Sequence, residues 1–79
     1  MNYFLIADMD AQRFTIYHLR NNESFYHAFR DFVEKKTGHV ILASLQNAPL
    51  HNVSIADAGE MDEGYFEPFL SEFRVKNNL

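Results

Sequence analysis

A chain of 79 residues is long enough for a single domain, residues 1–79, and too short to form two independent cores. It contains no cysteine, which excludes disulfides and thiolate metal sites, so we expect its eight phenylalanines and four tyrosines to supply the core. The net charge is −4, and an acidic balance argues against direct nucleic-acid binding, which needs a basic footprint.

The first segment of the chain predicts an antiparallel hairpin. Tyr3–Met9 is rich in strand-forming residues, Phe14–Leu19 alternates, and a short polar link joins the two runs. The alternation predicts one face packed on the core and one face turned outward. We expect Phe4, Phe14 and Ile16 to face inward, and Tyr3, Leu5, Tyr17 and Leu19 to face outward.

The next segment predicts an amphipathic helix. Its apolar residues recur at helical spacing, at Phe25, Phe29, Phe32 and Val33. Asn22 or Ser24 can cap its start, and Lys35 and Lys36 suit the negative end of the helix dipole. Gly38 is the expected left-handed residue at which the helix ends.

Two more strands are predicted after this helix. Residues 39–46 are apolar on both faces, which is typical of a central, deeply buried strand. A turn containing Pro49 follows, since proline cannot continue a central strand. Val53–Ala58 is the expected fourth strand, ended by Gly59.

The last segment predicts a second amphipathic helix, with apolar residues at Tyr65, Phe66, Phe69, Leu70 and Phe73. Proline lacks an amide hydrogen and is best tolerated in the first turn of a helix. Pro68 therefore predicts a start near residues 65–67, with residues 61–64 as a lead-in loop.

The element order ββαββα predicts an α+β fold: a single two-layer domain in which two helices pack on one face of a four-stranded, mainly antiparallel sheet. A shift of forty residues aligns the segment from Glu23 to Phe29 with the segment from Glu63 to Phe69. A duplicated hairpin-plus-helix unit would explain this match, and so would any two amphipathic aromatic helices.

The sequence carries no recognisable motif for catalysis or for a cofactor. Its three glycines do not form a phosphate-binding loop, and its serines have no nucleophile-elbow context. Asp8 and Asp10 are interpreted as turn formers rather than a cation-binding pair. The histidines fall on four different elements, which favours surface or hairpin-end positions over zinc ligation; they are His18, His27, His39 and His51. We expect a protein that is not an enzyme and binds neither metal nor cofactor.

The whole charge excess lies in the last third of the chain. Residues 1–56 hold five acids and five bases, whereas residues 57–79 hold six acids and two bases. The six acids are Asp57, Glu60, Asp62, Glu63, Glu67 and Glu72. One prediction is that they contact a basic surface on a partner protein, such as a nucleic-acid-handling complex. The alternative is that they only favour the start of a helix and form its solvent-exposed face.

Tyr3 and Tyr17, if both face outward, are candidates for a second contact with a partner. The same two rings would also suit a base-stacking platform, but that would need basic residues alongside them, and the acidic balance argues against it.

In its small size, acidity, aromatic core and lack of cysteine, the chain resembles the small inhibitors encoded by phages and mobile elements, including anti-CRISPR and anti-restriction proteins. It is similar in the same general way to antitoxins and immunity proteins. The resemblance covers no motif and transfers no functional residue. It implies an inhibitor or regulator that binds a basic partner surface; the alternative is a self-associating module, such as a homodimer.

The chain starts without a basic leader and contains no stretch long enough to span a bilayer. We therefore expect a cytoplasmic protein that does not interact with membranes.

Overall fold

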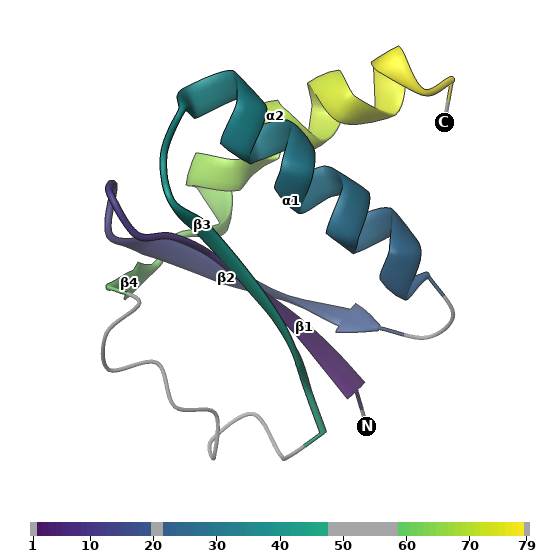
Figure 1. Ribbon diagram of the computed structural model, residues 1–79. Helices are drawn as coiled ribbons and strands as arrows, with labels where there is room; N and C mark the ends of the chain where they lie inside the picture. Colours follow the sequence, from purple (N-terminus) through teal and green to yellow (C-terminus); the bar gives the residue numbers. More distant parts are fainter. Residues whose placement is uncertain (1, 20–21, 48–58, 79) are drawn as a thin grey trace.

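The computed structural model describes residues 2–19, 22–47 and 59–78. Its elements follow the order β1 (Asn2–Asp8), β2 (Arg13–Leu19), α1 (Glu23–Thr37), β3 (Ile41–Gln46), β4 (Glu60–Met61) and α2 (Glu63–Lys76). Both helices lie on one side of the sheet (Figure 1), which confirms the predicted α+β fold with the order ββαββα. No helix in these ranges is long and apolar enough to cross a membrane.

The four strands are arranged in the order β3-β1-β2-β4. β1 pairs antiparallel with both β2 and β3, and β4 adds two residues parallel to β2. The predicted strand Val53–Ala58 lies outside the described residues, and Gly59 precedes β4. β3 and β4 are at opposite edges, so the described sheet does not repeat the β1–β2 hairpin in its second half.

The prediction that residues 39–46 form the central strand was wrong. β3 is an edge strand of the described sheet, and the central position belongs to β1, where residues 4–8 are all buried. Leu42 is 50% exposed and Val40 is 59% exposed. An apolar run predicts a strand, but the position of that strand in the sheet depends on long-range pairing that the local sequence does not encode.

The main core lies between the helices and the sheet. Phe73 of α2 packs its ring against three phenylalanines of α1, with centroids 5.2 Å from Phe25, 5.7 Å from Phe29 and 5.4 Å from Phe32. Ile6 of β1 joins the same cluster and is fully buried. A second buried cluster, formed by Leu5, Ala7 and Phe14, lies on the other face of the sheet.

The predicted faces of β2 were wrong. Residues 9–12 separate the strands, so Phe4 pairs with Tyr17 and Ala7 pairs with Phe14. Even-numbered residues of β1 therefore share a face of the sheet with odd-numbered residues of β2. Tyr17 therefore packs against the helices together with Phe4 and Ile6, and Leu19 shares that face. Phe14 and Ile16 lie on the face away from the helices, whereas the faces predicted for Phe4, Tyr3 and Leu5 were right.

Local signals place both ends of α1. Asn22 is the N-cap through its carbonyl, which accepts from the amides of Phe25 and Tyr26, and its side chain makes no capping bond. Gly38 adopts φ +72° and donates its amide to the Glu34 carbonyl over 2.8 Å, as predicted.

The predicted start of α2 was too late. The helix begins at Glu63, because the side chain of Asp62 caps it by accepting from the Tyr65 amide over 3.1 Å. Pro68 consequently lies in the second turn. Both Pro68 and Gly64, four residues before it, are exposed, so water can reach the carbonyl that loses its helical donor.

Candidate functional site

Two of the predicted acidic residues have structural roles. Asp62 caps α2, and its Oδ2 lies 3.4 Å from Nε of Arg13 in β2. Glu72 pairs with Lys36 across 2.6 Å and so links α2 to the end of α1. The predicted local role, an acid that favours a helix start, applies to Asp62 and also to Glu63, which lies in the first turn of α2, whereas Glu72 forms an ion pair with a base of α1.

Three other acidic residues, Glu60, Glu63 and Glu67, are exposed. Among the residues that the structure describes, no base forms an ion pair with any of them. We call these three residues the acidic array. Asp57, the sixth predicted acid, lies outside the described residues.

The docking of β4 on the β1–β2 turn positions Glu60. The amide of Glu60 donates to the Gln12 carbonyl over 3.1 Å, and the amide of Asp62 donates to the Phe14 carbonyl over 2.9 Å. Gly59 makes this approach possible: its φ is +92°, and a Cβ there would overlap the backbone of Gln12. Glu60 is in register with Arg13, which places it on the helix side of the sheet.

Glu63 and Glu67 lie four residues apart on α2 and therefore share a helix face. Both carboxylates lie close enough to Tyr17 of β2 to act electrostatically on it. Burial, with smaller contributions from Tyr26 and from these two carboxylates, raises the pKa of Tyr17. Arg74, seven residues after Glu67, acts on Tyr17 in the opposite sense, so the face changes from acidic to basic along α2. The acidic array is thus gathered around β4, β2 and the first half of α2.

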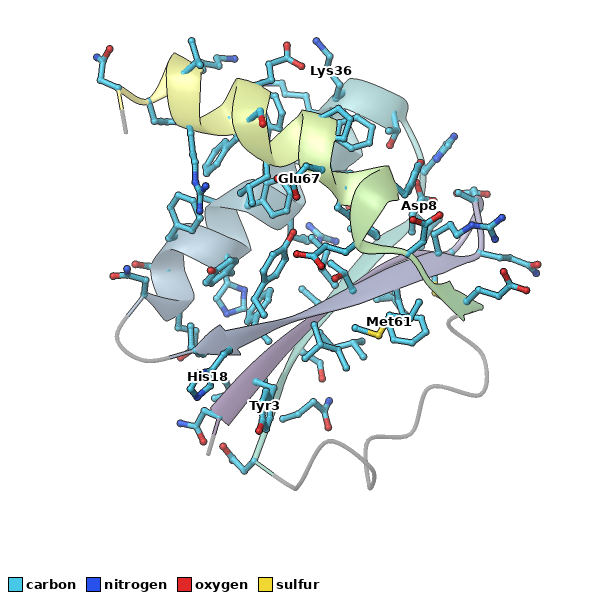
Figure 2. The ribbon with its side chains drawn as sticks, turned by 180° about the vertical axis from the view of Figure 1, so that it is seen from behind. Tyr3, Asp8, His18, Lys36, Met61 and Glu67 are labelled. Carbon is cyan, nitrogen blue, oxygen red and sulfur yellow. The ribbon has the colours of Figure 1, made fainter. Side chains whose placement is uncertain are left out.

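The structure separates the two candidate tyrosines. Tyr17 is half-buried on the helix side, where its ring stacks on Tyr26 with a centroid distance of 4.8 Å. Tyr3 is half-buried on the opposite face, with its ring 5.6 Å from the His18 ring, at the end of the sheet remote from Met61 (Figure 2). Since the two rings lie on opposite faces, they do not form one contact surface together.

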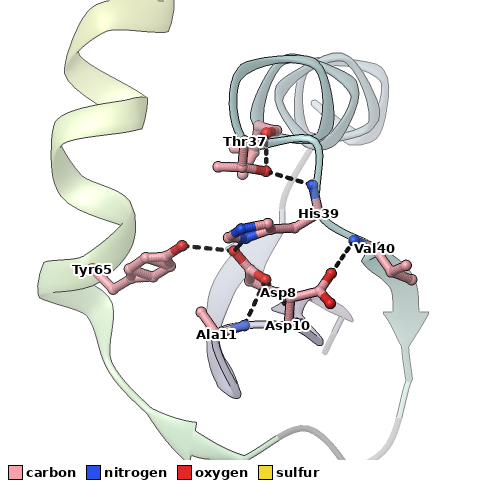
Figure 3. A network of polar contacts seen from close by, with 8 residues as sticks. Asp8, Asp10, Ala11, Thr37, His39, Val40 and Tyr65 are labelled. Atoms are coloured by element: carbon pink, nitrogen blue, oxygen red, sulfur yellow. Dashed lines mark hydrogen bonds and ion pairs between the residues drawn. The ribbon is translucent and has the colours of Figure 1, made fainter.

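A buried polar network centred on Asp8 is the main feature that the sequence did not reveal. Oδ1 of Asp8 accepts from the amides of Asp10 and Ala11, which confirms the turn-forming role predicted for Asp8, whereas the carboxylate of Asp10 bonds to the Val40 amide instead of its own turn. Its Oδ2 also accepts from the Tyr65 hydroxyl over 2.6 Å and pairs with Nδ1 of His39 over 2.8 Å (Figure 3). The side chain of Asp8 is fully buried, and its carboxylate joins β1, the segment between α1 and β3, and α2.

The network shifts the titration of its members. Burial alone would raise the pKa of Asp8, but the bonds from His39, Tyr65 and Ala11 outweigh it and hold that pKa below its usual value. The hydrogen bond to Asp8 raises the pKa of His39. Burial and the same carboxylate raise the pKa of Tyr65 to about 12.

Asp8, Asp10 and His39 also place three potential metal-ligand atoms within 4.8 Å of one another. These side chains already have protein partners: both oxygens of Asp8 accept hydrogen bonds, and Oδ2 of Asp10 accepts from the Val40 amide over 2.6 Å. A cation would have to displace these donors, so the arrangement is better suited to holding three elements together.

Described residues line at least two hollows beside the helices. The first, of about 150 Å³, is lined by Phe32, Lys35, Lys36, Glu72 and Lys76. The second, of about 340 Å³, is lined by Asn22, Phe25, Tyr26 and Arg74. Small-molecule sites usually measure about 300–1,000 Å³ and gather several polar groups around the ligand. The larger hollow lies at the lower end of this range and is lined by three polar side chains, those of Asn22, Tyr26 and Arg74, whereas the smaller one is below the range.

Comparison with known proteins gave no match: no family model, no curated protein and no solved structure is significantly similar to this chain. The geometry of the molecule is therefore the basis for the function proposed below.

Proposed function

We propose that this protein is a small, non-enzymatic interaction protein that inhibits or regulates a partner by binding a basic surface on it through the acidic array. The observation that carries the proposal is the division among the acids of the last third. Asp62 and Glu72 are engaged within the fold, whereas Glu60, Glu63 and Glu67 are exposed without an ion pair among the described residues.

Hydrogen bonds also hold the backbone that carries the array. The amides of Glu60 and Asp62 bond to the β1–β2 hairpin, and the Asp62 side chain caps the first turn of α2. The nearby base Arg13 is already engaged by Asp62 and by the Gln12 carbonyl. Pre-arranged charges of one sign accelerate association with an oppositely charged surface and select against acidic partners.

The test compares two variants of equal charge. The array variant carries Glu60→Gln, Glu63→Gln and Glu67→Gln; the control variant carries Glu23→Gln, Asp31→Asn and Glu34→Gln on α1, where the carboxylates pair with His27 and Arg30. Asp62 is left intact because its loss would disturb the start of α2. Both variants lose three negative charges.

Each protein is used to capture partners from lysate of the native host at low and at high salt. The proposal predicts a basic protein that wild type and control variant retain at low salt, that high salt releases, and that the array variant fails to retain. Retention of the same protein by the array variant would contradict the proposal, and so would the absence of any salt-sensitive partner of the wild type.

A further inference from the structure

Within the part of the chain that the structure describes, β3 presents a sheet edge without the usual protection. It is the outermost strand next to β1 among the described residues (Figure 1), and its sequence, Ile41 to Gln46, contains no charged residue and no proline. Natural edge strands are usually protected by charge, proline, a bulge or a covering loop. Leu42 and Leu45 are also partly exposed.

The hydrogen-bond pattern identifies the backbone groups that point outward from this edge. The amide of Met9 donates to the Val40 carbonyl over 2.9 Å, and the β1–β3 register continues from that pair. Because bonded pairs alternate in an antiparallel ladder, Leu42, Ser44 and Gln46 bond toward β1. The amides and carbonyls of Ile41, Ala43 and Leu45 therefore face away from the sheet.

One of these outward groups already has a partner. Nε of Arg30 reaches over from α1 and donates to the Ile41 carbonyl over 2.9 Å. Arg30 also pairs with Asp31 and Glu34, so both acids of α1 next to this edge are held in ion pairs within the fold. Among the described residues, Ala43 and Leu45 are left as adjacent outward-facing residues that can bond to another strand.

We propose that two copies of the chain pair through β3, antiparallel and around a two-fold axis at Ser44. In this register Ala43 and Leu45 of each copy exchange four hydrogen bonds with Leu45 and Ala43 of the other, and the Arg30 contact remains intact. A two-fold axis at Ala43 would instead require the Ile41 carbonyl, which Arg30 occupies.

Charge favours a second copy as the occupant of this edge. Residues 40–47 carry no charge, so the paired strands would have no like-charge repulsion despite the net charge of −4. The acidic array lies at the opposite edge of the sheet, beside β4, so the dimer keeps the two arrays apart and displays one at each end. The proposed pairing does not depend on the function of the array.

Blocking one outward amide tests the pairing. Ala43→Pro removes an amide that points away from β1, so it leaves the intramolecular ladder complete. It deletes two of the four predicted bonds between copies, which should weaken dimerisation by about tenfold or more. Sedimentation or light scattering over a range of concentrations should show wild type approaching the mass of two chains and Ala43→Pro remaining near one, with unchanged far-UV circular dichroism.

A cross-linking experiment tests the register independently of proline. The chain has no cysteine, and residues directly opposite in a non-bonded antiparallel pair have Cα atoms about 4.5 Å apart, within disulfide range. Ser44→Cys should therefore form a covalent dimer on mild oxidation, whereas Leu42→Cys, which would face Gln46 of the second copy, should not.

The proposal is overturned if wild type keeps the mass of one chain at all concentrations, if Ala43→Pro dimerises as well as wild type, or if Ser44→Cys cross-links no faster than Leu42→Cys. A single-chain mass for wild type combined with binding of an extended partner peptide at β3 would equally overturn it, because a foreign strand would then be the occupant.

Discussion

The hydroxyl of Tyr65 donates a hydrogen bond to Oδ2 of Asp8 over 2.6 Å and so attaches the first turn of α2 to the end of β1. The bond joins residues 57 positions apart in the sequence. Because its acceptor is a buried carboxylate that also pairs with His39, it fixes the element that carries Glu63 and Glu67 relative to the sheet.

Tyr65→Phe should destabilise the fold by about 2 kcal/mol, since a hydrogen bond to a charged group typically contributes roughly 1.5–3 kcal/mol. Chemical denaturation of the single variants Tyr65→Phe and Asp8→Ala and of the double variant measures the coupling. In the Asp8→Ala background, Tyr65→Phe should cost much less. Additive losses would show that the two side chains are not coupled.

The Asp8–His39 pair should make stability depend on pH in a defined window. Because the pKa of His39 is raised in the folded state, its contribution to folding stability is complete below about pH 6.5 and is lost as pH rises through its folded-state pKa. The lowered pKa of Asp8 means that its contribution is present above about pH 4 and is lost as pH falls through the folded-state value. The pair should thus stabilise most between about pH 4 and 6.5.

His39→Gln tests this window, because it removes the titrating ring while Asp10 and Tyr65 still surround Asp8. The difference in unfolding free energy between wild type and His39→Gln, measured by denaturation from pH 4 to 9, should shrink as pH rises above about 6.5. A difference that stays constant over this range would rule out the ionised pair.

Gly59→Ala should disrupt the docking of β4. A Cβ at this position would overlap the backbone of Gln12, and the positive φ of +92° disfavours any other residue. We expect a loss of more than about 2 kcal/mol and faster amide exchange at Glu60 and Asp62. Gly64→Ala is the matched control: its Cβ would lie 3.4 Å from Oδ1 of Asp62, and alanine in a helix should be neutral or stabilise by up to about 1 kcal/mol.

Phe73→Ala should remove the ring that contacts all three phenylalanines of α1. Truncating a buried phenylalanine costs about 3–5 kcal/mol, a large part of the stability of a domain of this size. Val75→Ala on the same helix is the control, since Val75 is 77% exposed and should change stability by less than about 0.5 kcal/mol. If Phe73→Ala and Val75→Ala had equal denaturation midpoints, the assignment of Phe73 to the core would be contradicted.

The sequence predicted several features that are encoded over short distances, although the local Asp62 cap that starts α2 was missed. The phenylalanine spacing and Gly38 located α1 because helix periodicity and the left-handed cap are local properties. The side chains of β2 were assigned to the wrong faces because the length of the turn at residues 9–12 sets the parity of the pairing.

Features that depend on long-range arrangement were not predictable. The exposure of β3 follows from the strand order. The buried network joins Asp8 to His39, which is 31 positions away in the sequence, and to Tyr65, which is 57 positions away. Asp62 and Glu72 could not be separated from the acidic array, because the sequence does not show that their partners are Arg13 and Lys36. The sequence shows that this segment is acidic, but it does not show which carboxylates are already paired within the fold.

The central claim is that the acidic array, and not acidity in general, recognises a basic surface. Titration of ¹⁵N-labelled protein with an arginine-rich peptide tests it most directly, because the three array acids can be compared with the three acids of α1 in one spectrum. We predict shifts concentrated at Glu60, Glu63 and Glu67 that diminish as salt is added. Shifts of equal size at Glu23, Asp31 and Glu34 would contradict the claim.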